Sequence, residues 1–235
     1  MKILAVLAHP DDEAFGPAGT LSRYSLTGHT VRLATMTQGE AGTLGPARDL
    51  TPRELARIRS DELRRSAEAL HLTGVNIYTL PDGKLAQLPA DQGIGIIRHE
   101  IETFSPDALL TFHSDGISGH PDHQTVARWC LSAIRENSRP LRLFAYGVGE
   151  DQARRVTHRK LMPIPDGELT HILDVSNYLE FKFAAIRCHQ SQAEAWERMK
   201  NIEGGLESYL RNEHFSLVWP APKQPARTRS TRLED

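Results

Sequence analysis

The sequence predicts an α/β fold: a Rossmann-like open, mostly parallel sheet with helices on both faces. Two observations carry this prediction. Short apolar runs typical of strands alternate with longer amphipathic stretches typical of helices, which is the pattern of a parallel sheet covered by helices. The chain has 235 residues, 39% of them hydrophobic, so it is long enough to bury a sizeable core.

The predicted elements follow one another in a regular order. Strands are expected at 2–8, 30–37, 75–80, 108–112 and 141–148, with helices between them at about 12–27, 52–71, 91–104 and 121–137. The helix over 52–71 has the clearest signals, because Thr51 can serve as its N-cap, Pro52 suits its first turn and apolar residues recur on one face. Beyond residue 150 we expect a strand at 169–175 and helices at about 177–189 and 193–211.

The domain organisation is simple. The sequence contains no recognisable linker or internal repeat, so residues 1–219 are expected to form a single domain. Residues 220–235 contain three prolines, scattered arginines and little that could be buried. This composition predicts a flexible C-terminal tail.

Composition and charge exclude several classes of protein. A formal net charge of -2 argues against nucleic-acid and membrane-surface binding, which require a basic excess. The apolar start is too short for a signal peptide, and no other run is long enough to span a bilayer. Two distant cysteines, Cys130 and Cys188, suggest neither a disulfide framework nor a cysteine zinc site, and they favour a reducing cytoplasm.

Two similar motifs each follow a predicted strand. His9-Pro10-Asp11-Asp12 comes after the strand at 2–8, and His120-Pro121-Asp122-His123 comes after the strand at 108–112. Ligands of open parallel sheets bind at the carboxyl ends of the strands, so both motifs lie at the functional edge. In each motif two side chains three residues apart can point into one crevice. The prolines stiffen the turns that present them.

These residue types indicate a catalytic zinc site. Zinc binds imidazole nitrogen and carboxylate oxygen, and three protein ligands plus water form the catalytic arrangement. In the alternative interpretation, His9 and His120 cap helices while the aspartates bind backbone N–H groups. Two such motifs at one sheet edge favour the metal. The nucleotide fingerprints G-x-G-x-x-G and G-x-x-x-x-G-K-[ST] and the hydrolase elbow G-x-S-x-G are absent from the sequence.

The two motifs resemble those of the LmbE-like (PIG-L) family of zinc-dependent N-acetylglucosaminyl deacetylases. Four further segments support the resemblance, which covers about residues 2–192. They are Thr37-Gln38-Gly39-Glu40-Ala41-Gly42, Arg59-Ser60-Asp61-Glu62, Leu80-Pro81-Asp82-Gly83 and His189-Gln190-Ser191-Gln192. The metal motifs are specific, whereas each of these segments is weak by itself.

The resemblance assigns roles position by position. His9, Asp12 and His123 would bind Zn²⁺, or another divalent ion such as Fe²⁺. Asp11 would be the general base, His120 would stabilise the oxyanion, and Asp122 would orient His120. Glu40, Arg59 and Asp82 match positions expected to approach the sugar, although Arg59 could instead pair with Glu40 or Glu62. Glu13 is interpreted as a residue that favours the start of a helix.

The implied reaction is removal of an N-acetyl group from a small N-acetylated sugar or glycoconjugate, giving acetate and a free amine. One position departs from the family pattern, because Ser118 stands where some members have a tyrosine, and serine cannot polarise a carbonyl as a phenol does. Two alternatives stay open: a metal-dependent amidase or esterase acting on a non-sugar substrate, and a non-catalytic metal-binding protein. The aglycone is not indicated, and the resemblance is compatible with a homo-oligomer.

Overall fold

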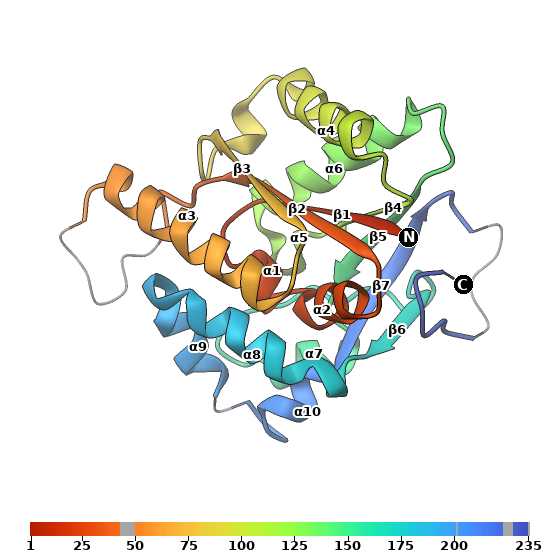
Figure 1. Ribbon diagram of the computed structural model, residues 1–235. Coiled ribbons are helices and arrows are strands. Elements are labelled where there is room, and N and C mark those ends of the chain that lie inside the picture. Colours follow the sequence, from red (N-terminus) through yellow and green to blue (C-terminus); the bar gives the residue numbers. More distant parts are fainter. Residues whose placement is uncertain (43–49, 201, 223–227, 235) are drawn as a thin grey trace.

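One sheet organises the molecule. Over the residues that the computed structural model describes, 1–42, 50–200, 202–222 and 228–234, seven strands form it in the order β3-β2-β1-β4-β5-β7-β6 (Figure 1). The strands are β1 Lys2–Leu7, β2 Thr30–Thr37, β3 Gly74–Leu80, β4 Ala108–Phe112, β5 Arg142–Gly147, β6 His171–Asp174 and β7 Asn212–Trp219.

Helices join most of the strands. The α-helices are α1 Asp12–Phe15, α2 Ala18–Leu26, α3 Pro52–Ala69, α4 Ala90–Phe104, α5 Gly116–Gly119, α6 Pro121–Arg135, α7 Glu150–Arg155, α8 Leu179–Cys188, α9 Ala193–Met199 and α10 Leu206–Leu210. Short 3-10 turns lie at η1 Leu85–Gln87, η2 Ser176–Tyr178 and η3 Gln190–Gln192. Among the described helices, none combines the length and apolarity needed to cross a lipid bilayer.

The strand order creates a crevice beside β1. Strands β3, β2, β1, β4 and β5 are parallel, while β7 runs antiparallel to both β5 and β6. From β1 the chain moves outward to β2 and β3, then returns to the other side of β1 with β4. Such a reversal separates the loops after β1 and β4, which is where open α/β sheets bind ligands. The predicted fold class is confirmed.

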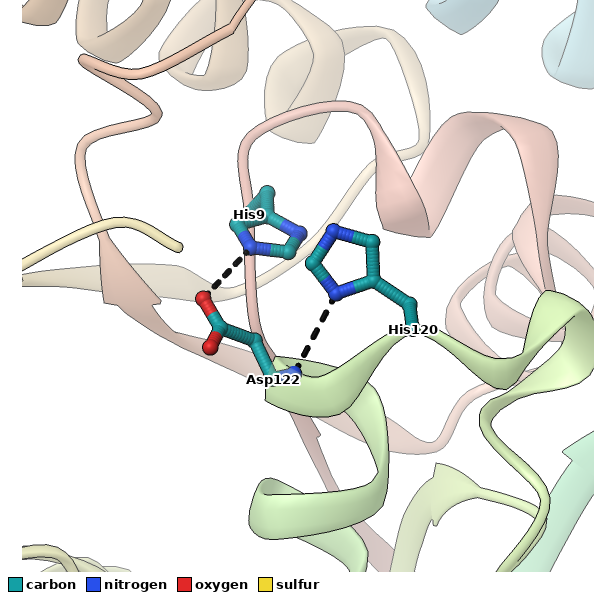
Figure 2. Close-up of side chains that lie close together, drawn as sticks. All are labelled: His9, His120 and Asp122. Carbon is teal, nitrogen blue, oxygen red and sulfur yellow. Dashed lines mark hydrogen bonds and ion pairs between the residues drawn. The ribbon is translucent and has the colours of Figure 1, made fainter. Parts of the chain in front are cut away.

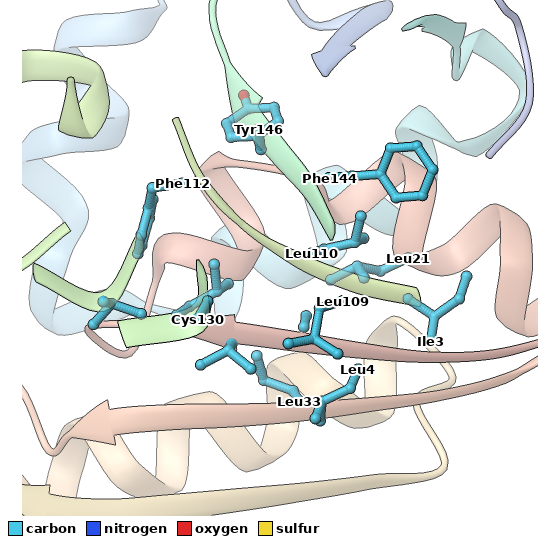
Figure 3. Close-up of a cluster of buried hydrophobic side chains, with 14 of the residues drawn as sticks. Ile3, Leu4, Leu21, Leu33, Leu109, Leu110, Phe112, Cys130, Phe144 and Tyr146 are labelled. Carbon is cyan, nitrogen blue, oxygen red and sulfur yellow. The ribbon is translucent and has the colours of Figure 1, made fainter. Parts of the chain in front are cut away.

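The core lies on both faces of the sheet. Helices α4 and α6 cover one face, and α2, α3 and α8 cover the other (Figure 1). Strand β4 is buried along its whole length, and β1 is buried from Ile3 to Leu7. Figure 3 shows side chains of these strands packed together, among them Ile3, Leu4, Leu109 and Leu110. Burial on both faces explains why these strands read as continuous apolar runs.

Helix α3 begins where the sequence predicts. The Thr51 hydroxyl accepts a hydrogen bond from the Glu54 N–H, and the Glu54 carboxylate accepts one from the Thr51 N–H. This reciprocal capping box satisfies two backbone donors that the helix itself leaves free.

Two predicted helices are interrupted. The helix expected over 12–27 is divided into α1 and α2 at Gly16-Pro17, because Pro17 has no N–H and the chain passes close to the Asp12 carbonyl. A Cβ at Gly16 would lie 2.4 Å from that oxygen. The helix expected over 193–211 ends at Met199 and resumes at Leu206, after Gly204 and Gly205 at positive φ. Strand β7 was not predicted.

The C-terminal segment differs from the expected flexible tail over residues 228–234. Leu233 is fully buried, and its N–H donates to the Tyr24 hydroxyl at 2.7 Å. The Ser230 N–H donates to the Thr170 carbonyl, and the Ser230 carbonyl accepts from the Ile172 N–H, both at 2.9 Å. These bonds tie the segment to the edge strand β6. Residues 223–227 of the expected tail lie outside the described residues.

Candidate metal centre

The two histidine-proline motifs meet in the crevice between β1 and β4. His9 follows β1 and Asp12 opens α1, while His120 caps α6 and His123 lies in its first turn. Figure 2 shows the rings of His9 and His120 facing each other from these two loops, with Asp122 beside them. Residues more than 100 positions apart are adjacent because their strands pair.

The donor atoms of three residues have separations that suit a metal ion. His123 Nε2 lies 3.1 Å from Asp12 Oδ1 and 3.3 Å from His9 Nδ1, and His9 Nδ1 lies 3.4 Å from Asp12 Oδ2. Ligands about 2.0–2.1 Å from a tetrahedral Zn²⁺ would be about 3.3–3.4 Å apart. His9, Asp12 and His123 therefore fit a divalent cation, as the sequence predicts.

The other nitrogen of His9 is held by two carboxylates. His9 Nε2 lies 3.1 Å from Asp82 Oδ1 and 3.2 Å from Asp122 Oδ2. Such a carboxylate–histidine arrangement orients a ligand ring and makes it a better donor. Burial alone lowers the pKa of His9, but its bonds with Asp12, Asp122 and Asp82 raise that pKa well above the usual value. Burial raises the pKa of Asp12, whereas His123 and His9 hold it well below its usual range.

His123 is oriented in a similar way. Its Nδ1 lies 3.2 Å from the Gly116 carbonyl oxygen, which accepts the Nδ1–H and leaves Nε2 free to face Asp12. Its ring stacks on Phe112 with centroids 4.0 Å apart. Gly116 has φ +68°, and a Cβ there would meet Gln124 and His123 at 3.0 and 3.3 Å. Only glycine fits this approach without strain.

Asp11 lies next to the donors but binds a different group. Its carboxylate is 3.1 Å from the guanidinium of Arg59, and its backbone has φ 111°, a strained value for a residue with a side chain. Burial raises the pKa of Asp11 to about 6, with Arg59 opposing the shift and Asp12 adding to it. A carboxylate of this kind can accept a proton near neutral pH.

The buried pair of Glu13 and His189 holds Asp11 in position. Glu13 is fully buried, and its Oε2 accepts the Asp11 N–H at 3.1 Å. Its Oε1 lies 2.6 Å from His189 Nε2 and also accepts the Ser66 hydroxyl. Burial lowers the pKa of His189, but Glu13 raises it above the usual value. The sequence indicated for Glu13 only a place at the start of a helix. The signals for this pair are a glutamate directly after the first motif and the late His-Gln-Ser-Gln segment.

The Asp122 carboxylate contacts a different histidine from the one expected. It faces His9 and accepts the N–H groups of Gly83 and Leu85 at 2.8 and 3.0 Å (Figure 2). Its backbone N–H instead donates to His120 Nδ1 at 3.2 Å. Burial, with help from His123 and His9, lowers the pKa of His120. A neutral ring with its proton on Nε2 fits this geometry.

Comparison with known proteins identifies the family. The family model described as PIG-L, GlcNAc-PI de-N-acetylase, matches residues 4–134, more than half of the chain. The chain belongs to the PIG-L family. The 1D-myo-inositol 2-acetamido-2-deoxy-alpha-D-glucopyranoside deacetylase 1 of Saccharopolyspora erythraea is 28% identical over 272 residues, covering 92% of this chain and 89% of that protein.

Solved structures share the PIG-L fold. The N,N'-diacetylchitobiose deacetylase of Pyrococcus horikoshii has a TM-score of 0.66 and 23% identity, covering 83% of this chain and 74% of its own. GalB, the 4-carboxy-2-hydroxymuconate hydratase of Pseudomonas putida, has a TM-score of 0.71 and 17% identity. The match covers 96% of this chain and 99% of the GalB chain. Because a hydratase shares the fold, the reaction must be argued from the site.

The three residues expected near the sugar also have partners inside this PIG-L protein. Arg59 is 3% exposed and donates to the carbonyls of Pro10 and Gly39. Asp82 accepts the Ala41 N–H at 2.8 Å in addition to facing His9, and Glu40 accepts the Asp82 N–H at 2.8 Å. Arg59 and Asp82 thus orient Asp11 and His9, while Glu40 is half-buried beside them.

A cavity of about 180 Å³ adjoins the donors in this PIG-L protein. Asp11, Asp12 and His123 line it together with Tyr146 from β5. Ser118, which departs from the family pattern, is exposed on α5. The cavity therefore offers a phenol from strand β5 rather than from α5.

Proposed function

We propose that this protein is a metal-dependent N-deacetylase that hydrolyses the N-acetyl group of an N-acetylglucosamine-type substrate. The observation that carries the proposal is Asp11, a carboxylate with a raised pKa that stands beside three metal donors and opens onto a cavity. A storage or structural site has no use for an unliganded carboxylate at that place. The relatives named as deacetylases support the same reaction.

His9, Asp12 and His123 would hold the ion, with Zn²⁺ as the first candidate and Fe²⁺ as the second. Their nitrogen and oxygen donors suit either metal. When bound, the ion supplies Lewis acidity, which polarises a carbonyl and lowers the pKa of a water molecule. Asp82, Asp122 and the Gly116 carbonyl keep the two imidazoles in position.

Asp11 acts as general base and takes a proton from the attacking water. Arg59 and the N–H bond to Glu13 fix its position. Positioned proton transfer of this kind contributes typically about 10²–10⁴-fold to the rate. After the carbonyl carbon has been attacked, the amide C–N bond breaks, the acyl group leaves as a carboxylate and the nitrogen leaves as an amine.

His120 donates a hydrogen bond from Nε2 to the developing oxyanion. Its Nδ1 accepts the Asp122 N–H, which selects the neutral ring with Nε2 as donor. Neutral donors can stabilise an oxyanion when they are aligned in advance. This role does not need an imidazolium.

The test is acetate release from N-acetylglucosaminyl-inositol and N,N'-diacetylchitobiose by protein loaded with Zn²⁺ or Fe²⁺. We expect amine and acetate in equal amounts, and Asp11→Asn should keep its metal while kcat falls by about 10² or more. Full metal occupancy without hydrolysis of any acyl compound would favour a binding protein. Faster cleavage of simple esters or non-sugar amides would favour the other alternative.

A further inference from the structure

The cavity beside the donors has two different ends. Asp11, Asp12 and His123 form the polar end, where the scissile amide must lie if the proposed function holds. Apolar and aromatic side chains form most of the remaining wall: Phe15, Phe112, Ile117, Tyr146, Val148, Leu161, Met199 and Leu210. An apolar group would match this part of the wall.

The apolar wall is built into the fold. Tyr146 and Val148 are two residues apart at the end of β5, so their side chains lie on the same face. Phe112 comes from the neighbouring end of β4. Phe112, Val148, Leu161 and Leu210 are between 2% and 6% exposed, so the wall is deep rather than superficial.

Gln152 and Lys182, two of the polar side chains along this wall, are already bonded. The Gln152 amide nitrogen donates to the carbonyls of Tyr209 and Asn212, and its oxygen accepts the Gly149 N–H. The Lys182 ammonium donates to Glu213 and to the Gly16 carbonyl, both at 2.6 Å. Arg159 also lines the cavity but is exposed, so its charge stays in water. Besides these, Asn212 and the hydroxyls of Tyr146 and Tyr209 are the lining groups that could bind the hydroxyl groups of a sugar ring.

The size of the cavity exceeds what acetyl needs. A cavity of roughly 150 Å³ can hold benzene. The volume here is about 180 Å³, so the single methyl group of an acetyl would leave most of it empty. Filling apolar space with apolar atoms is favourable.

We propose that this cavity binds the acyl chain of the substrate and that the enzyme prefers N-acyl groups of about four to six carbons over acetyl. The proposal rests on the proposed function and names the substrate class of that site. The reaction is unchanged: water supplies hydroxyl to the acyl carbon and a proton to nitrogen, the C–N bond breaks, and a short-chain fatty acid and an amine form.

The first test compares N-acetyl, N-butyryl and N-hexanoyl glucosamine as methyl glycosides. We expect kcat/KM to rise by about fourfold per added methylene until the cavity is full, since each buried methylene contributes about that factor. Octyl N-acetylglucosaminide supplies an apolar aglycone with an unchanged acyl group. A higher kcat/KM for the octyl glycoside, without a rise for longer acyl groups, would show that the cavity binds the aglycone. That result would overturn the proposal.

The second test changes a residue of the wall and also measures the binding of carboxylates of different chain length. Val148→Phe should lower the hexanoyl-to-acetyl ratio of kcat/KM by at least about tenfold, whereas Leu26→Phe adds the same ring at the exposed end of α2 and should leave the ratio unchanged. Calorimetry with metal-loaded protein should show hexanoate binding more tightly than butyrate, and butyrate more tightly than acetate.

The outcomes separate this proposal from the proposed function. Hydrolysis of the acetyl compound with rates that fall steadily as the acyl chain lengthens would overturn the acyl cavity and leave the deacetylase intact. No hydrolysis of any of these amides would overturn the proposed function itself.

Discussion

At the scale of single residues, His9 connects the metal centre to its support. Nδ1 faces Asp12 and His123, while Nε2 faces Asp82 and Asp122. The carboxylates raise the pKa of His9 and so favour its protonated form before an ion binds. A cation must therefore displace a proton, and metal affinity should fall as pH falls.

His123→Ala tests the ligand set. The change removes Nε2 and leaves two protein ligands, so we expect metal affinity to fall by more than about 100-fold, beyond the 10–100-fold typical of an outer partner. Asp122→Asn alters a partner of His9 rather than a ligand, so it should lower metal affinity less. Metal content and competition with a chelator measure both. Unchanged stoichiometry and affinity in His123→Ala would remove His123 from the ligand set.

Variants of Arg59 test whether Asp11 is the general base, through the pH dependence of kcat/KM. Asp11 must be ionised to accept a proton, and its pKa is raised to about 6, so kcat/KM should fall as pH drops through about 6, or lower when a cation is bound beside it. Arg59→Gln removes the charge that lowers this pKa and should move the acid limb upward. Arg59→Lys keeps the charge and should move it less. An acid limb at the same pH in all three proteins would exclude Asp11 as its source.

At the scale of elements, α4 and α6 show how a glycine fixes a helix contact. A Cβ at Gly93 would lie 2.2 Å from the ring of Trp129, which is on α6. Gly95, two residues further along α4, has open space around its Cβ position. The same substitution should therefore have opposite effects at these two positions.

Gly93→Ala should destabilise the protein by about 1–3 kcal/mol through overpacking. Gly95→Ala should stabilise it by about 0.5–1 kcal/mol, because a helix-interior glycine costs conformational entropy. Urea denaturation midpoints measure both changes. Effects of the same sign would show that Gly93 is not the contact that sets the distance between the two helices.

Local sequence signals predicted the elements that depend on local physics. The start of α3 is confirmed because Thr51, Pro52 and Glu54 act within one turn. Strand β7 was missed because it contains Glu213, which is buried through bonds to Lys182 and to the N–H groups of Gly19 and Thr20. Those partners are distant in sequence, so no local pattern shows that the glutamate can be buried.

The candidate site divides in the same way. The donors could be predicted because each follows an apolar strand, and parallel strands end at one edge. The partners of the Asp122 carboxylate could not be predicted. They are the N–H groups of Gly83 and Leu85, which come from the segment after β3 and are distant in sequence. The roles of the ligands and of the base stay predictions until variants are measured.

At the scale of the whole molecule, the C-terminal segment 228–234 packs against α2. Leu233 is fully buried beside Tyr24, although its surrounding sequence is polar. Leu233→Ala should cost about 2–5 kcal/mol, as expected for a buried leucine. Leu26→Ala removes a leucine that is 44% exposed and should change stability by no more than about 0.5 kcal/mol. Thermal or urea unfolding measures both changes. Equal losses of stability in the two variants would show that residues 228–234 are a flexible tail.

Strand β7 has a consequence for biosynthesis. Among the described strands it is synthesised after β5 and β6, yet it lies between them in the finished sheet. Until residues 212–219 emerge, β5 presents an unpaired edge and β6 has no neighbour beside which to form. At roughly 5–20 residues per second, translation of the intervening 148–211 leaves that edge open for several seconds. The nascent chain therefore carries this unpaired edge late in its synthesis, when the residues of the candidate metal site have already been synthesised.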